Sequence, residues 1–171
     1  QSVRRHALGG QPRLWPALGR LPKLERLSLR GCELRAETLV PAAGFSLLRC
    51  LELARNPLSA RNLRELLDAA PELHLARLDL DRCRLEPTEL TELLGAAALA
   101  PLQELDLGGN PIGEGALACS ERLATLRALR SLGLAETELD GRKIQHLLRR
   151  LPPLAALDLE GNKLGVTGLK A

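Results

Sequence analysis

The feature that most constrains the fold is a short leucine pattern that recurs six times along the chain. The copies are LERLSLRGCEL (24–34), LRCLELARNPL (48–58), LARLDLDRCRL (75–85), LQELDLGGNPI (102–112), LRSLGLAETEL (129–139) and LAALDLEGNKL (154–164). Their starts lie 24, 27, 27, 27 and 25 residues apart, and each fits L-x-x-L-x-L-x-x-[N/C/T]-x-[L/I]. Self-similarity at such a period predicts stacked structural units rather than one irregular globular core.

Composition agrees with a regular, repeated core. The 171 residues include one Trp, one Phe, no Tyr and no Met, so leucine and alanine must supply nearly all the packing. A chain of this length is expected to form about one domain. We therefore predict a single repeat domain over residues 12–171, and we expect residues 1–11, which have no periodicity, to be disordered.

Each copy of the pattern predicts a strand that is followed by a helical return. In LQELDLGGNPI, Leu105 and Leu107 alternate with Asp106, so the leucines point to one face and the carboxylate to the other. The segments between the copies carry apolar residues at helical spacing. These residues are Leu63, Leu66 and Leu67; Leu90, Leu93 and Leu94; Leu117; and Ile144, Leu147 and Leu148. Strands joined by such returns are expected to be parallel.

The six copies resemble the leucine-rich repeat family over residues 14–171. Their period and helical content are similar to the ribonuclease-inhibitor-like class, which occurs mostly inside cells. The resemblance implies an α/β solenoid: a curved horseshoe with parallel strands on its concave side and helices on its convex side. About six repeats and a partial N-terminal one are expected. Since no polar cap follows the last copy, we expect the chain to be a fragment of a longer protein.

The ninth position of the pattern holds a small side chain that is expected to bond to unpaired backbone groups in the turn. It is Cys32, Asn56, Cys83, Asn110, Thr137 and Asn162. The resemblance implies that cysteine substitutes for asparagine here, so Cys32 and Cys83 have structural roles. Cys119 is expected to pack between repeats. The position of Cys50 faces outward, which predicts an exposed thiol.

No catalytic, metal or cofactor site is evident in the sequence. His6, His74 and His146 are far apart, and the four cysteines form no CxxC pair near a histidine cluster. No Ser/His/Asp set assembles at matching positions, and there is no P-loop. The chain is thus predicted to be non-enzymatic and to bind no cofactor. Reduced cysteines and the lack of an Asn-x-Ser/Thr sequon favour an intracellular protein, cytoplasmic or nuclear. The sequence contains no apolar run of 18 or more residues, so no membrane span is predicted.

Motif positions three, five and seven are expected to form the concave face, and their charges differ in sign from the rest of the chain. They hold seven acidic and three basic residues, whereas the whole chain has a net charge of +3. The predicted partner-binding residues are Glu52, Asp79, Asp81, Glu104, Asp106, Asp158, Glu160, Arg77, Arg26 and Arg30. The resulting hypothesis is a protein-interaction module that binds a basic partner through an acidic groove. The strongest contacts are expected at Glu52, Asp79, Asp81, Glu104 and Asp106, with Asp79 and Asp106 both facing solvent.

Three other interpretations stay open at this point. The concave carboxylates are equally consistent with ordinary solubilising residues of exposed strand positions. The solenoid is also consistent with packing against other domains of its own chain, as repeat arrays do in innate immune sensors. Arginines on the convex segments suggest nucleic-acid contact more weakly, because no aromatic side chains alternate with them. Fold alone does not decide between these functions.

Overall fold

The computed structural model describes residues 20–34, 46–68, 70 and 72–165. The predicted disordered segment 1–11, the residues 12–19 of the partial N-terminal repeat and the chain end after residue 165 lie outside the described residues. Leu39 and Leu169, which lie five residues after the first and the last copy of the leucine pattern, are also outside them. The six copies of the leucine pattern are all described.

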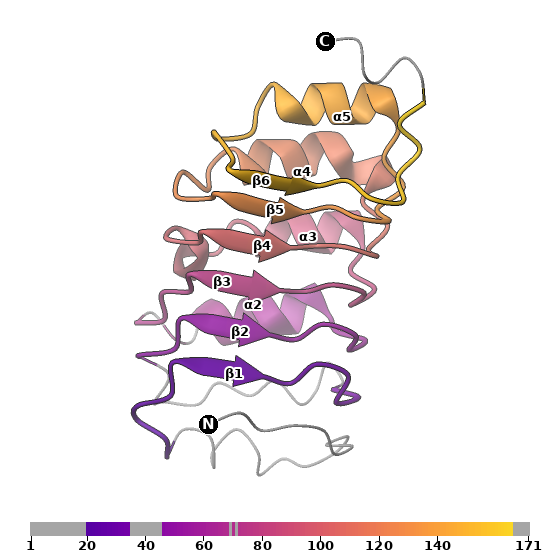
Figure 1. The fold of residues 1–171 in the computed structure, drawn as a ribbon. Coiled ribbons are helices and arrows are strands. Elements are labelled where there is room, and N and C mark those ends of the chain that lie inside the picture. The colour runs from indigo at the N-terminus through magenta and orange to yellow at the C-terminus, as the bar shows by residue number, and fades with distance from the viewer. Residues whose placement is uncertain (1–19, 35–45, 69, 71, 166–171) are drawn as a thin grey trace.

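Each copy of the pattern forms one short strand, and the six strands build one parallel sheet (Figure 1). The strands are β1 (Arg26–Ser28), β2 (Cys50–Glu52), β3 (Arg77–Asp79), β4 (Glu104–Asp106), β5 (Ser131–Gly133) and β6 (Ala156–Asp158). They are hydrogen-bonded in chain order, and each residue pairs with the same motif position of the next strand. The predicted α/β solenoid and its register are confirmed.

Helices cover one face of this sheet, and no described helix or strand covers the other (Figure 1). They are α2 (Ala60–Asp68), α3 (Pro87–Leu93), α4 (Ala116–Leu123) and α5 (Gly141–Leu148), with short 3₁₀ turns η2 (Ala97–Leu99) and η3 (Gly113–Gly115). Leucines from the inner side of the strands pack against leucines of the helices, and most are at most 3% exposed. The core is therefore a continuous leucine layer between sheet and helices.

Two of the predicted helix positions are wrong. Leu117 is 53% exposed, because α4 buries Ala116, Cys119, Ser120 and Leu123 instead. The 3₁₀ turn η3 precedes this helix and changes its rotation. The turn packs closely on the preceding repeat, since a Cβ at Gly115 would lie 2.2 Å from Pro87. Leu148, at the end of α5, is 47% exposed. The other predicted helix residues are buried.

The ninth-position side chains connect the turns of neighbouring repeats, as expected. Asn110 is fully buried; its Oδ1 accepts the amide of Leu85, and its Nδ2 donates to the carbonyls of Leu80 and Leu107. Asn56 and Asn162 each bond in the same way to their own repeat and the preceding one. Each asparagine thus satisfies buried backbone groups of two repeats.

The turns alternate between two types. Cys32, Cys83 and Thr137 are each followed by a residue with positive φ, and these are Glu33, Arg84 and Glu138. Pro57 and Pro111 follow the asparagines of repeats two and four. A proline fixes φ near −65°, so these two turns exclude the conformation that the odd repeats adopt. One turn type thus occurs in repeats one, three and five, and the other in the repeats that follow them, so the structure repeats in pairs of repeats.

Candidate functional site

The uncovered side of the sheet, here called the open face, is formed by motif positions three, five and seven of the six strands and the residues after them. It is the surface that the sequence predicts as concave. A hollow of about 400 Å³ runs along it, lined by residues from Arg30 at one end to Asp158 at the other. Parallel strands lie ~4.8 Å apart, so a given motif position forms a row of side chains at that spacing.

Three aspartates at position five bond to the backbone immediately after their strand. The Oδ1 atoms of Asp79, Asp106 and Asp158 accept the amides two residues later, at 3.0, 2.9 and 2.9 Å. The amides at positions six and eight, by contrast, donate to the next strand, for example Leu80 to the carbonyl of Asp106. The aspartates therefore stabilise a turn that the sheet ladder leaves open. These hydrogen bonds give the three carboxylates a structural contact in addition to their predicted role in partner binding.

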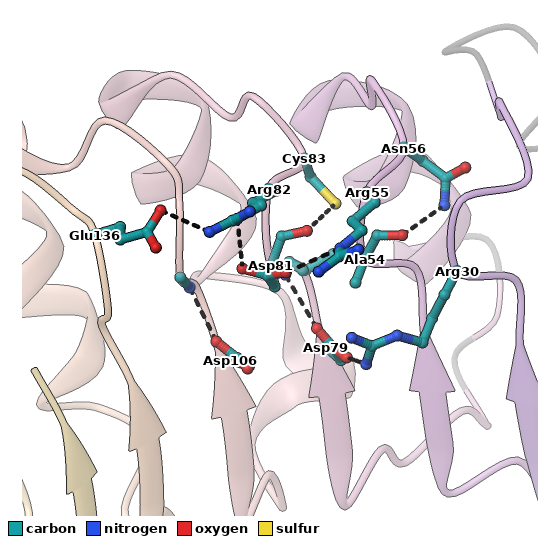
Figure 2. Close-up of polar contacts among 12 residues, drawn as sticks. Arg30, Ala54, Arg55, Asn56, Asp79, Asp81, Arg82, Cys83, Asp106 and Glu136 are labelled. Carbon is teal, nitrogen blue, oxygen red and sulfur yellow. Dashed lines mark hydrogen bonds and ion pairs between the residues drawn. The ribbon is translucent and has the colours of Figure 1, made fainter. Parts of the chain in front are cut away.

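The prediction that Asp79 faces solvent is wrong. Its residue is 7% exposed, and its carboxylate forms an ion pair with Arg30 (Figure 2). Arg30 crosses the second repeat to reach it, where position seven is the small, fully buried Ala54. Burial raises the pKa of Asp79, and the amide of Asp81 and the charge of Arg30 only partly oppose this rise. The carboxylate is a largely enclosed group with both oxygens engaged.

Asp81 and Glu104 also have basic neighbours. Arg77 pairs with Glu104 across adjacent strands at 2.5 Å. Asp81 lies 3.9 Å from Arg55 and 3.7 Å from Arg82 (Figure 2). Burial, followed by the charge of Asp106, raises the pKa of Asp81.

Arg55 and Arg82 contribute positive charge to the open face that motif positions three, five and seven do not predict. They occupy position eight, where φ is positive in all six repeats and three repeats carry glycine instead. The recurring glycine signals the turn, but nothing in the sequence predicts that Arg55 reaches Asp81 in the next repeat. Arg82 also bonds to Glu136, two repeats further on, at 2.6 Å.

The acidic groups without a basic partner among the described residues concentrate toward the C-terminal half of the open face. Asp106, Asp158 and Glu160 are exposed and form no ion pair there, and Glu52 forms none in the N-terminal half. Between Asp106 and Asp158 the same row holds Gly133. A Cβ at Gly133 would lie 2.5 Å from Oδ1 of Asp106, so the carboxylate leans over this glycine. Arg26, also predicted for the site, is exposed at the N-terminal end.

Cys50 is not the exposed thiol that its outward position predicts. It is 7% exposed, since the long side chains of Arg26 and Arg77 flank it in the same row of the sheet. Burial, together with the nearby charge of Glu52, raises the pKa of this thiol. Burial likewise raises the pKa of Cys83 to about 12 and that of Cys119 above its ordinary value. These thiols are thus protonated and poorly nucleophilic at neutral pH.

Some of the basic residues on the helical side are paired along their own helices. Arg61 pairs with Glu65 and Arg64 with Asp68, both four residues apart on α2. Lys143 lies within 4 Å of Glu114 and Asp140. This arrangement is typical of a solvated helix surface. It weakens the nucleic-acid interpretation for α2, although Arg149 and Arg150 stay exposed beyond α5.

Within the described part of the chain, no group of three or more His, Cys, Asp or Glu side chains is arranged to hold a metal ion. The four cysteines are all buried, and none of them forms a disulfide bond. No described helix is both long enough and apolar enough to cross a membrane.

Comparison with known proteins identifies the repeat directly. A family model described as Leucine Rich repeat matches residues 95–118 and 151–171, which contain the motifs of repeats four and six. No curated protein matches the chain.

Proposed function

Because this chain belongs to the leucine-rich repeat family, whose domains generally mediate protein–protein interaction, we propose that it is a non-catalytic module that binds a basic partner protein. The proposed binding surface is the open face of its sheet. The family is typically non-catalytic. The period and helical returns support a place in the ribonuclease-inhibitor-like class. Four cysteines that form no disulfide bond support an intracellular location.

The observation that carries this proposal is the uneven pairing of charge along the open face. Asp79, Asp81 and Glu104 already have arginine partners within the chain. Asp106, Asp158 and Glu160 have none among the described residues, so a partner's cation meets less competition there. The proposed contact surface therefore centres on repeats four to six rather than on the middle repeats that the sequence favours.

The spacing of Asp106 and Asp158 suits an arginine side chain. They occupy the same row two strands apart, so their carboxylates are separated by about 9–10 Å. Both carboxylates have the same orientation, because each accepts the amide two residues later. A guanidinium held by a hydrogen bond of ~2.8 Å on each side spans about 8 Å between the acceptor oxygens. Gly133, which lies between the two acids in this row, has no side chain and leaves room for the carboxylate of Asp106 to lean over it.

The test is a salt-dependent binding assay against histones and Arg/Lys-rich peptides, with duplex DNA alongside. Asp106→Asn/Asp158→Asn is expected to weaken binding to a basic protein by at least ~10-fold, or about 1.4 kcal/mol. Higher salt should weaken wild-type binding, because exposed charges are screened. A charge-matched control, Glu92→Gln/Glu121→Gln, changes two exposed acids on α3 and α4 and is expected to bind like wild type.

A third variant separates geometry from net charge. Gly133→Ala places a Cβ 2.5 Å from Oδ1 of Asp106, so the carboxylate must move while the charge is unchanged. We expect it to weaken binding as well. Because the shift of the carboxylate disturbs its bond to the amide of Gly108, we expect a loss of at most about 1 kcal/mol in the free energy of unfolding, and a cooperative urea transition is the check on folding. Equal binding by wild type and both open-face variants would refute the proposed surface. Binding of DNA alone, lost in Arg149→Gln/Arg150→Gln, would favour the convex side instead.

A further inference from the structure

The edge of the sheet at which all six strands begin, here called the entry edge, carries four arginines close to β5 and β6. Because the strands are parallel, every loop that leads from a helix into a strand reaches the sheet at this same edge (Figure 1). The loop from α4 to β5 contains Arg127 and Arg130, and the loop from α5 to β6 contains Arg149 and Arg150. All four are exposed, and neither loop contains an acidic residue. Arg150 also contacts the ring of His146 on α5.

The two loops are adjacent in the stack, and their arginines have no acidic partner within the described part of the chain. The amides of Ala155 and Ala156, at the end of the second loop, donate to the carbonyl of Arg130 at 2.7 and 3.0 Å. Nη1 of Arg130 donates to the carbonyls of Leu129 and Arg127, so this guanidinium lies against its own loop. Among the described residues, no acid forms an ion pair with any of the four arginines. Their positive charge is therefore available to a partner.

The positive charge is confined to a short length of the entry edge in this half of the solenoid. The preceding loop, residues 94–103 between α3 and β4, contains no charged side chain. Arg49 lies on the same edge but is separated from the four arginines by this uncharged loop. At the opposite edge, the turn after β5 holds Glu136, Glu138 and Asp140 and no basic residue. Repeat five thus has basic residues where its strand begins and acidic residues where its strand ends.

This arrangement suits a short run of carboxylates better than a nucleic acid. The guanidinium group binds a carboxylate through two parallel hydrogen bonds, and all four basic residues here are arginines. A longer polyanion gains no further cation at the loop 94–103, and it approaches the acids of the open face. Gly133, in the same row as Asp106 and Asp158, is three residues after Arg130, or about 10 Å away along the strand. That distance is close to the screening length of about 8 Å at physiological salt, so the repulsion is only partly screened.

Base stacking is also missing from this surface. The chain has one Trp and one Phe, Trp15 and Phe45, and both lie outside the described residues. Proteins that bind single-stranded nucleic acid combine a basic groove with aromatic side chains on which the bases stack. The described part of the chain offers the basic residues alone. An acidic polypeptide needs no such platform.

We propose that the entry edge beside β5 and β6 binds an acidic segment of a partner polypeptide, whose carboxylates pair with Arg127, Arg130, Arg149 and Arg150. This contact is separate from the one proposed for the open face and does not depend on it. The entry edge lies along the side of the stack, and repeats of a solenoid contact only their neighbours along its axis. A further repeat would therefore lengthen this edge without covering it.

The test measures binding of a fluorescein-labelled hexaglutamate peptide by fluorescence anisotropy, at about 20 mM salt, where screening is weak. We expect Arg127→Gln/Arg130→Gln and Arg149→Gln/Arg150→Gln each to weaken binding at least ~5-fold, because each removes two of the four cations. The charge-matched control is Arg61→Gln/Arg142→Gln. It changes two exposed arginines in the first turns of α2 and α5, at the helix ends away from the entry edge, and is expected to bind like wild type. A cooperative urea transition in each variant is the check on folding.

A further variant and a second probe complete the test. Asp106→Asn/Asp158→Asn removes acids of the open face, so it is expected to bind hexaglutamate at least as tightly as wild type, whatever it does to a basic partner. The proposal is overturned if wild type does not bind hexaglutamate, or if both entry-edge variants bind it as wild type does. It is equally overturned if an oligothymidylate with six phosphates binds more tightly than hexaglutamate and loses this binding in the entry-edge variants. That result would assign the entry edge to nucleic acid.

Discussion

Asp79 offers a sharp test of how the open face is built, because its backbone contact and its charge have opposite effects. Its Oδ1 accepts the amide of Asp81 at 3.0 Å, which stabilises the folded chain. Its ionised form is disfavoured by burial, which raises its pKa above the ordinary 3.8 despite the ion pair with Arg30. Asp79→Ala removes both the bond and the charge, whereas Asp79→Asn keeps an acceptor oxygen and removes only the charge.

The two substitutions should therefore differ in size. Asp79→Ala leaves a partly buried amide without its acceptor, and we expect a loss of about 1–3 kcal/mol in the free energy of unfolding. Asp79→Asn is nearly the same size and is expected to cost less than about 1 kcal/mol at neutral pH. Asp106 is the matched control, because it makes the same amide bond but is exposed. Water can replace its carboxylate, so Asp106→Ala should cost about 0.5–1 kcal/mol.

The pH dependence provides the second part of the test. Since the folded-state pKa of Asp79 lies above its unfolded-state value, the folded chain binds more protons in the window just above pH 3.8. The corresponding stability is fully present below that pH and is lost as the pH rises through the folded-state pKa. Asp79→Asn does not titrate there. The stability of wild type relative to Asp79→Asn is therefore expected to fall as the pH rises.

Urea unfolding followed by far-UV circular dichroism, at several pH values from 3 to 7, measures both effects. Comparing two variants at each pH cancels the titration of all other groups that they share. If Asp79→Asn destabilises the chain as much as Asp79→Ala, the amide bond is not what Asp79 contributes. If the stability of wild type relative to Asp79→Asn rises with pH, the ion pair with Arg30 outweighs burial. Either result would refute the reasoning.

Two further predictions concern the core. Asn110→Ala leaves buried backbone groups of two repeats unsatisfied and should lower the free energy of unfolding by about 3–5 kcal/mol. Cys83→Ala, at the same motif position, loses mainly one weak thiol bond to the carbonyl of Leu53 and should lower it by about 1 kcal/mol. Equal losses in urea unfolding would contradict the role of the asparagine. Leu105→Asp buries an unpaired charge and is expected to abolish the cooperative transition, while Leu117→Asp, at a position that is 53% exposed, should retain it. If Leu117→Asp unfolds the chain, Leu117 does not lie on the exposed side of α4.

Strand positions and register follow from the sequence because a leucine at every second residue admits one buried face. All six strands lie where the pattern predicts them, and position nine makes the expected backbone bonds. The burial of Asp79 and Cys50 does not follow from the pattern. It depends on Arg30, which is 49 residues from Asp79 in the sequence, and on the arginines that flank Cys50 in the sheet. A motif position predicts the direction in which a side chain points, but it does not predict which neighbouring side chains cover it.

The rotation of α4 is a second feature that periodicity does not determine. Counting five residues from Ile112, the last residue of the fourth copy, assigns Leu117 to the core, but Cys119 and Leu123 are buried in its place. The difference arises in a turn of three residues, where glycine permits close contact with Pro87 of the preceding repeat. A one-residue change in the start of a helix rotates each side chain by about 100°, since a turn takes 3.6 residues.

The two turn types and most ion pairs of the open face are distributed over different junctions between repeats, the exception being Arg77 with Glu104 between repeats three and four. Asn56, Asn110 and Asn162 each bond to the preceding repeat, so they connect the repeats in pairs: one with two, three with four, and five with six. Between the pairs, Arg30 and Arg55 contact Asp79 and Asp81, and Arg82 contacts Glu136. These ion pairs supplement the sheet ladder where no asparagine spans the junction.

Acids that stabilise a junction are less available to an outside cation, since binding must first displace an internal partner. Asp106 and Asp158 belong to even-numbered repeats whose asparagines already make the connection to the repeat before. Their carboxylates bond to one amide each and have no ion pair among the described residues. The two carboxylates on either side of Gly133 therefore have no internal cation to displace, which supports the partner contact proposed for them.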